Sequence, residues 1–247
     1  MPRFGMVIDL SRCYGCRACM VACKVENNTP EAHFWMYVFR LEEGEYPQTQ
    51  MRFLPRPCQH CDNAPCVKVC PVQARYKRDD GLVVTDWDRC IGCRYCAVAC
   101  PYGVNYFNWN KPQKHQYLDW GSPEAEALQP VTNGASPPYA NPELDKPMKD
   151  GRRTAGGGHL KSVMEKCTFC VQRVEKGLNP ACASNCPAGA LIFGDLDNPD
   201  SQAAKLLAKN PSFRLKEDLN TQPKVHYIGG PPPGHDARQR EAVKGRE

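Results

Sequence analysis

The sequence has 247 residues, sixteen of them cysteine, and a formal net charge of +5 at pH 7. This composition excludes a disulfide scaffold, because such proteins are short, secreted and denser in cysteine. No apolar run approaches the roughly 18 residues that a membrane helix needs, so we expect no direct membrane span. The basic residues form no stripe with interleaved aromatic residues, so we expect no nucleic-acid partner.

The sequence predicts short strands and short helices joined by loops, since 23 prolines and 19 glycines interrupt it. The predicted strands cover residues 3–10, 34–40, 50–54 and 224–228. Short helices are expected after Cys19, after Cys96, over 170–176 and over 201–209. An Asp-Gly pair within residues 74–86 predicts a tight β-hairpin.

The cysteines fall into four groups of four, and none is left over. The first and third groups have the spacing C-x2-C-x2-C-x3-C, which in bacterial ferredoxins ligates 4Fe–4S clusters. Three of the groups end in Cys-Pro, as in those ferredoxins. Structural zinc sites instead use two well-separated pairs, often with histidine. The sequence therefore predicts four 4Fe–4S clusters.

The four groups form an internal duplication. Residues 7–23 and 84–100 match at their Cys, Gly, Arg and Val-Ala positions, and the second and fourth groups both end in C-x3-C-P-x-x-A. The short segment between Cys70 and Cys90 indicates that the second and third groups share one compact module. By elimination, the first and fourth groups share another.

We therefore predict an α+β fold of two tandem bacterial-ferredoxin-like modules, each binding two clusters, with long loops and an insertion. The expected segments are an outer module of residues 1–53 with 163–228, an inner module of residues 54–109, a Pro/Gly-rich surface insertion at 110–162 and an extended tail at 229–247. The insertion is interpreted either as a strap over a partner or as a disordered loop.

In two-cluster ferredoxins the fourth cysteine of a group ligates the neighbouring cluster. Our hypothesis is that the same crossing occurs here and produces four ligand sets. They are set A (Cys13, Cys16, Cys19 and Cys186), set B (Cys167, Cys170, Cys182 and Cys23), set C (Cys58, Cys61, Cys66 and Cys100) and set D (Cys90, Cys93, Cys96 and Cys70). Because each set already has four thiolates, His60 is interpreted as a structural residue.

The cysteine segments resemble the four-cluster electron-transfer subunit of the complex iron–sulfur molybdoenzyme family, which includes polysulfide, tetrathionate and dimethyl sulfoxide reductases. They are also similar to the iron–sulfur subunit of alternative complex III and of related quinone reductase complexes. The matching stretches are CYGCRACMVACKVENNTP, PRPCQHCDNAPCVKVCPVQA, GLVVTDWDRCIGCRYCAVACPYGVNYFN and MEKCTFCVQRVEKGLNPACASNCPAGALIFGDLDNPDS. The insertion departs from the shorter members of the family.

The resemblance implies a respiratory electron-transfer subunit with no catalytic residues of its own. Its partners would be a large molybdopterin-type subunit, or a descendant of one, and an integral membrane subunit that reacts with quinone. The resemblance also implies the crossing of the fourth cysteines. The alternatives are an independent soluble polyferredoxin, a zinc-binding interaction protein, and the β subunit of a formate dehydrogenase or hydrogenase.

The first residues, MPRFGMVIDL, contain no apolar signal segment and no twin-arginine pair, which favours the cytoplasm. Subunits that resemble this one are nevertheless often exported in the folded state beside a partner that carries the signal. We therefore expect membrane association through the partner subunits at the periplasmic, outer face of the inner membrane, with the cytoplasmic face as the alternative.

Overall fold

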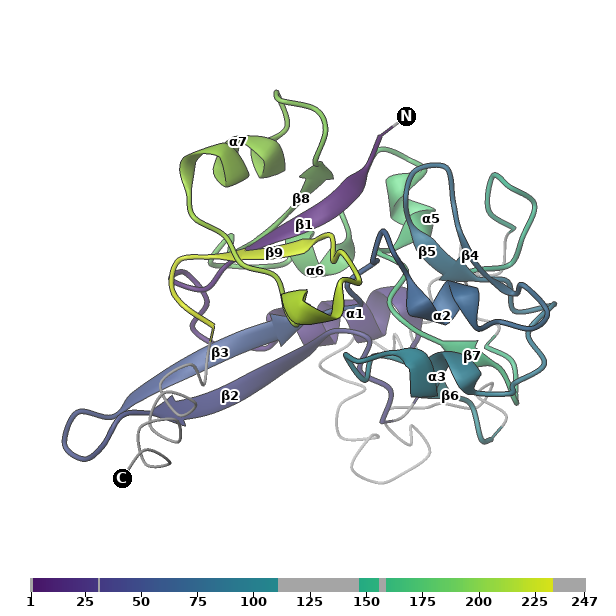
Figure 1. The fold of residues 1–247 in the computed structure, drawn as a ribbon, viewed down its shortest axis with the longest axis horizontal. Helices are drawn as coiled ribbons and strands as arrows, with labels where there is room; N and C mark the ends of the chain where they lie inside the picture. The colour runs from purple at the N-terminus through teal and green to yellow at the C-terminus, as the bar shows by residue number, and fades with distance from the viewer. Residues whose placement is uncertain (1, 31, 111–146, 156–158, 233–247) are drawn as a thin grey trace, which may run out of the picture.

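The computed structural model describes residues 2–30, 32–110, 147–155 and 159–232. Its content of short helices and strands agrees with the predicted α+β class (Figure 1). The strands are β1 (Phe4–Asp9), β2 (Tyr37–Glu43), β3 (Gln50–Arg56), β4 (Arg75–Lys77), β5 (Val83–Thr85), β6 (Tyr106–Phe107), β7 (Met164–Glu165), β8 (Leu191–Asp195) and β9 (Val225–Ile228). The helices are α1 (Ala18–Asn27), α2 (Pro65–Lys68), α3 (Tyr95–Ala99), α5 (Val171–Val174), α6 (Ala181–Ser184), α7 (Gln202–Lys209) and a 3-10 turn over Glu217–Leu219.

A three-stranded sheet brings segments from the beginning and the end of the chain together (Figure 1). Its central strand β1 pairs antiparallel with β8 and parallel with β9. Met6, Val7 and Ile8 of β1 are completely buried, because α7 packs on one face and the main core lies against the other. The first and last predicted strands are therefore confirmed.

Helix α7 confirms the predicted helix over 201–209. The Ser201 side chain caps it by accepting a 3.1 Å hydrogen bond from the backbone N–H of Ala204. A serine at this position satisfies one of the backbone donors that the first helical turn leaves unpaired. The buried Ala203 then faces Val7 of β1, which fixes α7 on the sheet.

The predicted hairpin forms from β4 and β5. Gly81 occupies its turn with φ 79°, and the N–H of Arg78 donates to the carbonyl of Leu82 over 2.8 Å. Glycine suits this turn because a positive φ carries little steric cost without a Cβ. The Asp-Gly prediction is confirmed.

A second, longer hairpin of β2 and β3 extends away from the rest of the chain (Figure 1). The strand predicted at 34–40 begins three residues later, at Tyr37. The reason is that Trp35 is buried, 2% exposed, with its ring edge-on to His159, so it belongs to the core and not to the hairpin. The strand predicted at 50–54 is confirmed and continues to Arg56.

Helices α1 and α3 form at the repeated cysteine loops, as predicted. Each begins one residue before the third cysteine of its group, Cys19 or Cys96. Helix α1 runs for 10 residues, whereas α3 stops after 5 at Cys100, because Pro101 disfavours a helical conformation at the preceding residue. The helix predicted at 170–176 is shorter than expected, since only α5 is helical in that segment.

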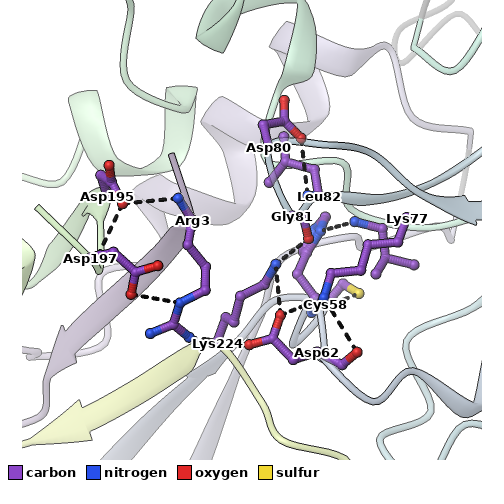
Figure 2. Close-up of polar contacts among 12 residues, drawn as sticks. Arg3, Cys58, Asp62, Lys77, Asp80, Gly81, Leu82, Asp195, Asp197 and Lys224 are labelled. Atoms are coloured by element: carbon purple, nitrogen blue, oxygen red, sulfur yellow. Dashed lines mark hydrogen bonds and ion pairs between the residues drawn. The ribbon is translucent and has the colours of Figure 1, made fainter. Parts of the chain in front are cut away.

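Charged side chains connect the sheet to the β4–β5 hairpin (Figure 2). Arg3 contacts Asp62 over 3.1 Å and Asp197 over 2.8 Å. Asp62 also accepts a 2.7 Å contact from Lys77, and the buried Lys224 lies 3.7 Å from it. These contacts join segments distant in the sequence, and Asp62 is the acceptor in three of the four.

Most of the insertion predicted at 110–162 lies outside the described residues. Its described ends correct the expectation of a surface loop, because Thr154, Ala155 and His159 are each at most 2% exposed. The His159 ring is held by Glu165, 2.7 Å from Nδ1, and by the carbonyl of Asn27, 2.9 Å from Nε2. These three residues of the insertion are therefore packed into the core, whereas residues 149–151 are exposed.

The tail predicted at 229–247 is described only as far as residue 232, where the carbonyl of Pro231 accepts a 2.6 Å hydrogen bond from Arg52. Among the described residues, no helix combines the length and apolar character required to cross a bilayer.

Candidate iron–sulfur centres

The two repeated loops have the same backbone conformation. Gly15 and Gly92 stand at the same place in the repeat, with φ 75° and 70°. Arg17 and Arg94 precede the helices in the left-handed region, each with φ 62°. Because residues other than glycine rarely adopt this conformation, its recurrence shows that each loop is tightly constrained around its three cysteines.

The second and fourth cysteine groups also share a local structure. The backbone N–H of His60 donates to Cys58 Sγ over 3.5 Å, and that of Phe169 donates to Cys167 Sγ over 3.4 Å. In both groups the third cysteine lies on a short helix, α2 or α6, that begins beside a proline. Proline suits this position because the first helical N–H has no partner to lose.

The structure brings the cysteines of the inner half together around two cavities. One cavity is lined by Cys58, Cys61, Cys66 and Cys100, which are the members of set C. The other is lined by Cys70, Cys90, Cys93 and Cys96, which are the members of set D. Each cavity therefore receives three cysteines from one group and the fourth from the other group.

The cysteines of the outer half gather in the same crossed manner. Burial, with added repulsion from Cys13 and Cys186, raises the pKa of the Cys19 thiol to about 12. Burial also raises the pKa of Cys23, with added repulsion from Cys167 and Cys170. Such repulsion requires proximity.

The donor chemistry of these sites fits iron–sulfur clusters. Buried thiols with raised pKa values are not stable as thiolates unless a cationic centre lies among them, and an iron–sulfur core supplies that charge. Backbone N–H groups already point at sulfur, as in the 3.3 Å contact from Ala190 to Cys186 and the 3.5 Å contact from Met164 to Cys90. Such hydrogen bonds orient cluster ligands and adjust their potential.

Two buried cations lie beside the inner cysteines. Arg75 is 2% exposed, and its Nη2 donates to Cys96 Sγ over 3.3 Å. Lys166 is also 2% exposed, lines the cavity of set C, and donates to the carbonyls of Val83 and Cys167. A buried positive charge favours nearby anionic sulfur, so both side chains complement a cluster.

His60 has a structural place between the two halves. Its ring stacks on Phe169 with the centroids 4.1 Å apart, and its Nδ1 accepts a 3.0 Å hydrogen bond from the N–H of Val83. Burial lowers its pKa well below the usual value, and the charge of Lys166 lowers it further. The ring is therefore neutral at pH 7, and its Nδ1 accepts a backbone hydrogen bond.

The cysteine sets differ in exposure in an ordered way. All four cysteines of set B are buried, and so are three of set C, whereas Cys16 of set A and Cys93 of set D are exposed. Burial raises the pKa of Cys182, with added repulsion from the other thiols of set B and from Cys19 of set A. Burial also raises the pKa of Cys167, with added repulsion from Cys58 of set C. Set B therefore has a neighbour in set A and another in set C.

The structure adds functional candidates that the sequence did not indicate. Asn27 Nδ2 lies 3.6 Å from Cys23 Sγ and 3.5 Å from Cys170 Sγ, and Arg75 contacts Cys96 as described above. Neither residue belongs to a cysteine motif. The only local signal was the position of Arg75 directly after C-P-x-x-A, where the fourth group has Leu191.

Comparison with known protein families identifies iron–sulfur domains in this chain. Two profiles described as 4Fe-4S dicluster domains match the chain, one at residues 12–74 and the other at 49–117 and 157–196. Together with the sixteen cysteines, they agree with four 4Fe–4S clusters.

Curated relatives match nearly the whole chain. An iron–sulfur subunit of Halobacterium salinarum, named for dimethyl sulfoxide reductase, is 42% identical over 93% of this chain and 80% of its own length. The arsenate respiratory reductase iron–sulfur subunit of a Shewanella species is 41% identical over 92% of this chain and 96% of its own. The menaquinone reductase iron–sulfur cluster-binding subunit of Nitratidesulfovibrio vulgaris is 35% identical over 92% and 88%. The chain therefore belongs to the family of 4Fe–4S dicluster iron–sulfur subunits, which transfer electrons within molybdoenzyme-type reductase complexes.

Proposed function

We propose that sets A, B, C and D each hold one 4Fe–4S cluster and that electrons pass along them in this order or its reverse. A 4Fe–4S cluster gains or loses one electron when bound, without making or breaking a substrate bond. Sets A and B would form an outer ferredoxin-like module with the β8–β1–β9 sheet. Sets C and D would form an inner module with the β4–β5 hairpin.

The single observation that supports this proposal most strongly is the order of exposure. Sets B and C have no exposed cysteine, which disfavours direct electron exchange with large partners, whereas sets A and D each have one exposed cysteine, Cys16 and Cys93. An isolated carrier needs one accessible centre, but a conductor between two partners needs one at each end. The exposed cysteines of sets A and D support the second arrangement.

The residues of the chain have three tasks in this function. The cysteines hold the clusters, the apolar core excludes water from sets B and C, and the N–H donors and buried cations favour the reduced state. Burial strengthens each electrostatic effect, since charges interact more strongly away from water. No residue of the chain needs to act on a substrate.

Exposed apolar side chains surround both end sets and support docking of a partner at each. Near set A these are Tyr14 (59% exposed) and Val21 (62%), and near set D they are Ile91 (63%), Tyr95 (54%), Val98 (81%) and Trp109 (63%). The Arg94 guanidinium stacks on the ring of Trp109 at 4.8 Å. Apolar surface of this kind marks protein interfaces.

The partners that fit are a large molybdopterin-type catalytic subunit, or a descendant of one, and an integral membrane subunit that reacts with quinone. Two docking surfaces on opposite ends of the proposed conductor support two partners. Attachment through the membrane subunit would hold the chain at the bilayer, and we place it at the periplasmic face. Protease accessibility in oriented vesicles distinguishes this face from the cytoplasmic one.

The decisive experiment is anaerobic purification of the native complex, with metal analysis and mass spectrometry. We expect about sixteen iron and sixteen acid-labile sulfide per chain, with 4Fe–4S visible absorption. Zinc without colour would contradict the proposal. An active monomer without partners would indicate an independent carrier, and a co-purified formate dehydrogenase or hydrogenase subunit would change the catalytic partner.

A further inference from the structure

Arg75 is buried beside the cavity of set D. Its side chain lines the cavity of set D, and its Nη2 donates to Cys96 Sγ over 3.3 Å and to Asn105 Oδ1 over 2.9 Å. Asn105 in turn lines the cavity of set C, so the residue that fixes the guanidinium faces the other set. The backbone N–H of Arg75 also donates to Cys70 Sγ over 3.4 Å.

The Arg75 guanidinium has more donors than its protein partners use. Of its three nitrogen atoms, Nε and Nη1 are buried and have no hydrogen-bond partner among the described residues. An unpaired buried N–H costs about 1–3 kcal/mol, and more on a charged group, so such donors are expected to face an acceptor. Sulfur is an acceptor that the adjoining set D cavity provides.

The charge of Arg75 reaches both sets. Burial disfavours the charge of Arg75, but Cys96, Cys66 and Cys58 outweigh that cost and raise its pKa. Conversely, Arg75 is the largest charge that lowers the pKa of Cys66, against the effect of burial. Because a guanidinium stays protonated at all ordinary pH values, this is a permanent positive charge.

We infer that Arg75 is a positioning residue that raises the reduction potentials of both inner clusters, most strongly that of set D. The inference rests on the ligand sets proposed above. Reduction adds one negative charge to a cluster, so a buried cation beside two clusters stabilises both reduced forms. Arg75 thereby favours electron residence on the inner half of the conductor.

The test uses the holoprotein in its complex, with redox titrations followed by electron paramagnetic resonance. In Arg75→Gln we expect the equilibrium constants for reduction of the two inner clusters to fall at least about tenfold. This corresponds to a midpoint potential lower by about 59 mV for one electron, and the potentials of both outer clusters should stay unchanged. Arg75→Lys keeps the charge but loses the planar fork, so it should shift them less. Arg89→Gln is the matched control, because it removes an exposed charge that adjoins Cys90 and is screened by water.

Unchanged inner potentials in a fully loaded Arg75→Gln protein would overturn the inference, as would equal shifts in Arg89→Gln. If Arg75→Gln does not assemble its clusters, the wild-type protein labelled with 15N-arginine provides a second measurement. We expect a nitrogen hyperfine coupling on the set D cluster that is lost in Arg75→Lys, and its persistence in that variant would contradict the inference. Failure of the proposed function itself would appear separately, as missing iron in the wild-type protein.

Discussion

The two halves of the molecule contain the same cysteine loop but continue differently after it. In the inner half Pro101 follows Cys100, and α3 ends after 5 residues. In the outer half Lys24 follows Cys23, so α1 continues to Asn27. The residue that directly follows the fourth cysteine therefore decides whether the helix continues past that cysteine. Only a helix that continues can bring a further side chain to the thiols.

The difference extends to the groups that contact sulfur. The longer helix α1 presents Asn27, a neutral amide, to two thiols of set B. In the inner half the corresponding donor is the cationic Arg75, whereas the repeat has the apolar Leu191 at that position in the outer half. Hydrogen bonds from charged donors are roughly twice as strong as neutral ones. Duplication thus preserved the ligand pattern and left the surrounding charges to diverge.

The largest expected effect comes from removing one crossed cysteine in each half. Cys100→Ala should destroy or convert the cluster of Cys58, Cys61 and Cys66, and Cys23→Ala should do the same to that of set B. Loss of one cluster would remove about a quarter of the iron in each variant. Spectroscopic assignment of the lost signal, with iron analysis, measures the effect.

The control for the crossing is Cys93→Ala, which should remove only the signal of set D. If Cys100→Ala gave the same spectrum as Cys93→Ala, the crossing would be absent and the two halves would consist of uncrossed clusters.

The next effect compares equivalent glycines of the two loops. A Cβ on Gly92 would collide with the carbonyl oxygen of Ser162, whereas on Gly15 it would collide with the Phe53 ring. Both have positive φ, but a ring can rotate and a backbone carbonyl cannot move alone. We expect Gly92→Ala to cost about 2–3 kcal/mol of unfolding free energy and Gly15→Ala about 1–2 kcal/mol.

Denaturant midpoints and loss of the 4Fe–4S absorption measure this difference. Equal losses in the two variants would show that positive φ alone sets the cost, and that the packing around the two loops does not matter.

The sequence was most informative where the constraint is local. Ligand spacing has to match the cluster, so Cys13 to Cys19 and Cys90 to Cys96 could be interpreted from spacing alone. The turn at Gly81 and the cap at Ser201 likewise depend on their neighbours in the chain. The crossing of the fourth cysteines was a hypothesis from family chemistry, and the placement of the thiols supports it.

The remaining features depend on contacts between distant segments. Asn27 meets Cys170 across 143 positions, and His159 meets Asn27 across 132, so no local pattern could indicate either. The shift of β2 had the same origin, because the burial of Trp35 depends on the packing of His159 against it. A Pro/Gly-rich composition favoured a surface insertion at 110–162, but contacts of the His159 ring with Glu165 and Asn27 bury this residue near the end of the segment.

A moderate effect is expected where the two halves meet. Asp62 accepts contacts from Arg3, Lys77 and the fully buried Lys224. Asp62→Asn would leave the Lys224 ammonium without its nearby carboxylate and should cost about 1–3 kcal/mol. Urea denaturation of the loaded protein measures this loss.

Asp197→Asn is the matched control at the same junction, since Asp197 is 56% exposed and pairs only with Arg3 among the described contacts. Exposed pairs contribute about 0–1 kcal/mol, so this variant should remain close to the wild type. Equal losses of unfolding free energy in the two variants would mean that the buried Lys224 does not add to the stabilising effect of Asp62.

The smallest effect tests the neutral donor of the outer half. Asn27→Leu removes the amide N–H that faces Cys23 and Cys170 while keeping a side chain of similar size. We expect the midpoint potential of the set B cluster to fall by less than Arg75→Gln lowers the set D cluster, because a neutral hydrogen bond contributes only about 0.5–1.5 kcal/mol. The control is Gln172→Leu, since Gln172 donates to the Asn27 oxygen over 3.1 Å and makes no hydrogen bond to a thiol within the described chain. Equal shifts in both variants would assign the effect to disturbed packing, whereas a shift confined to Asn27→Leu would show that the outer half adjusts its cluster with a dipole and the inner half with a charge.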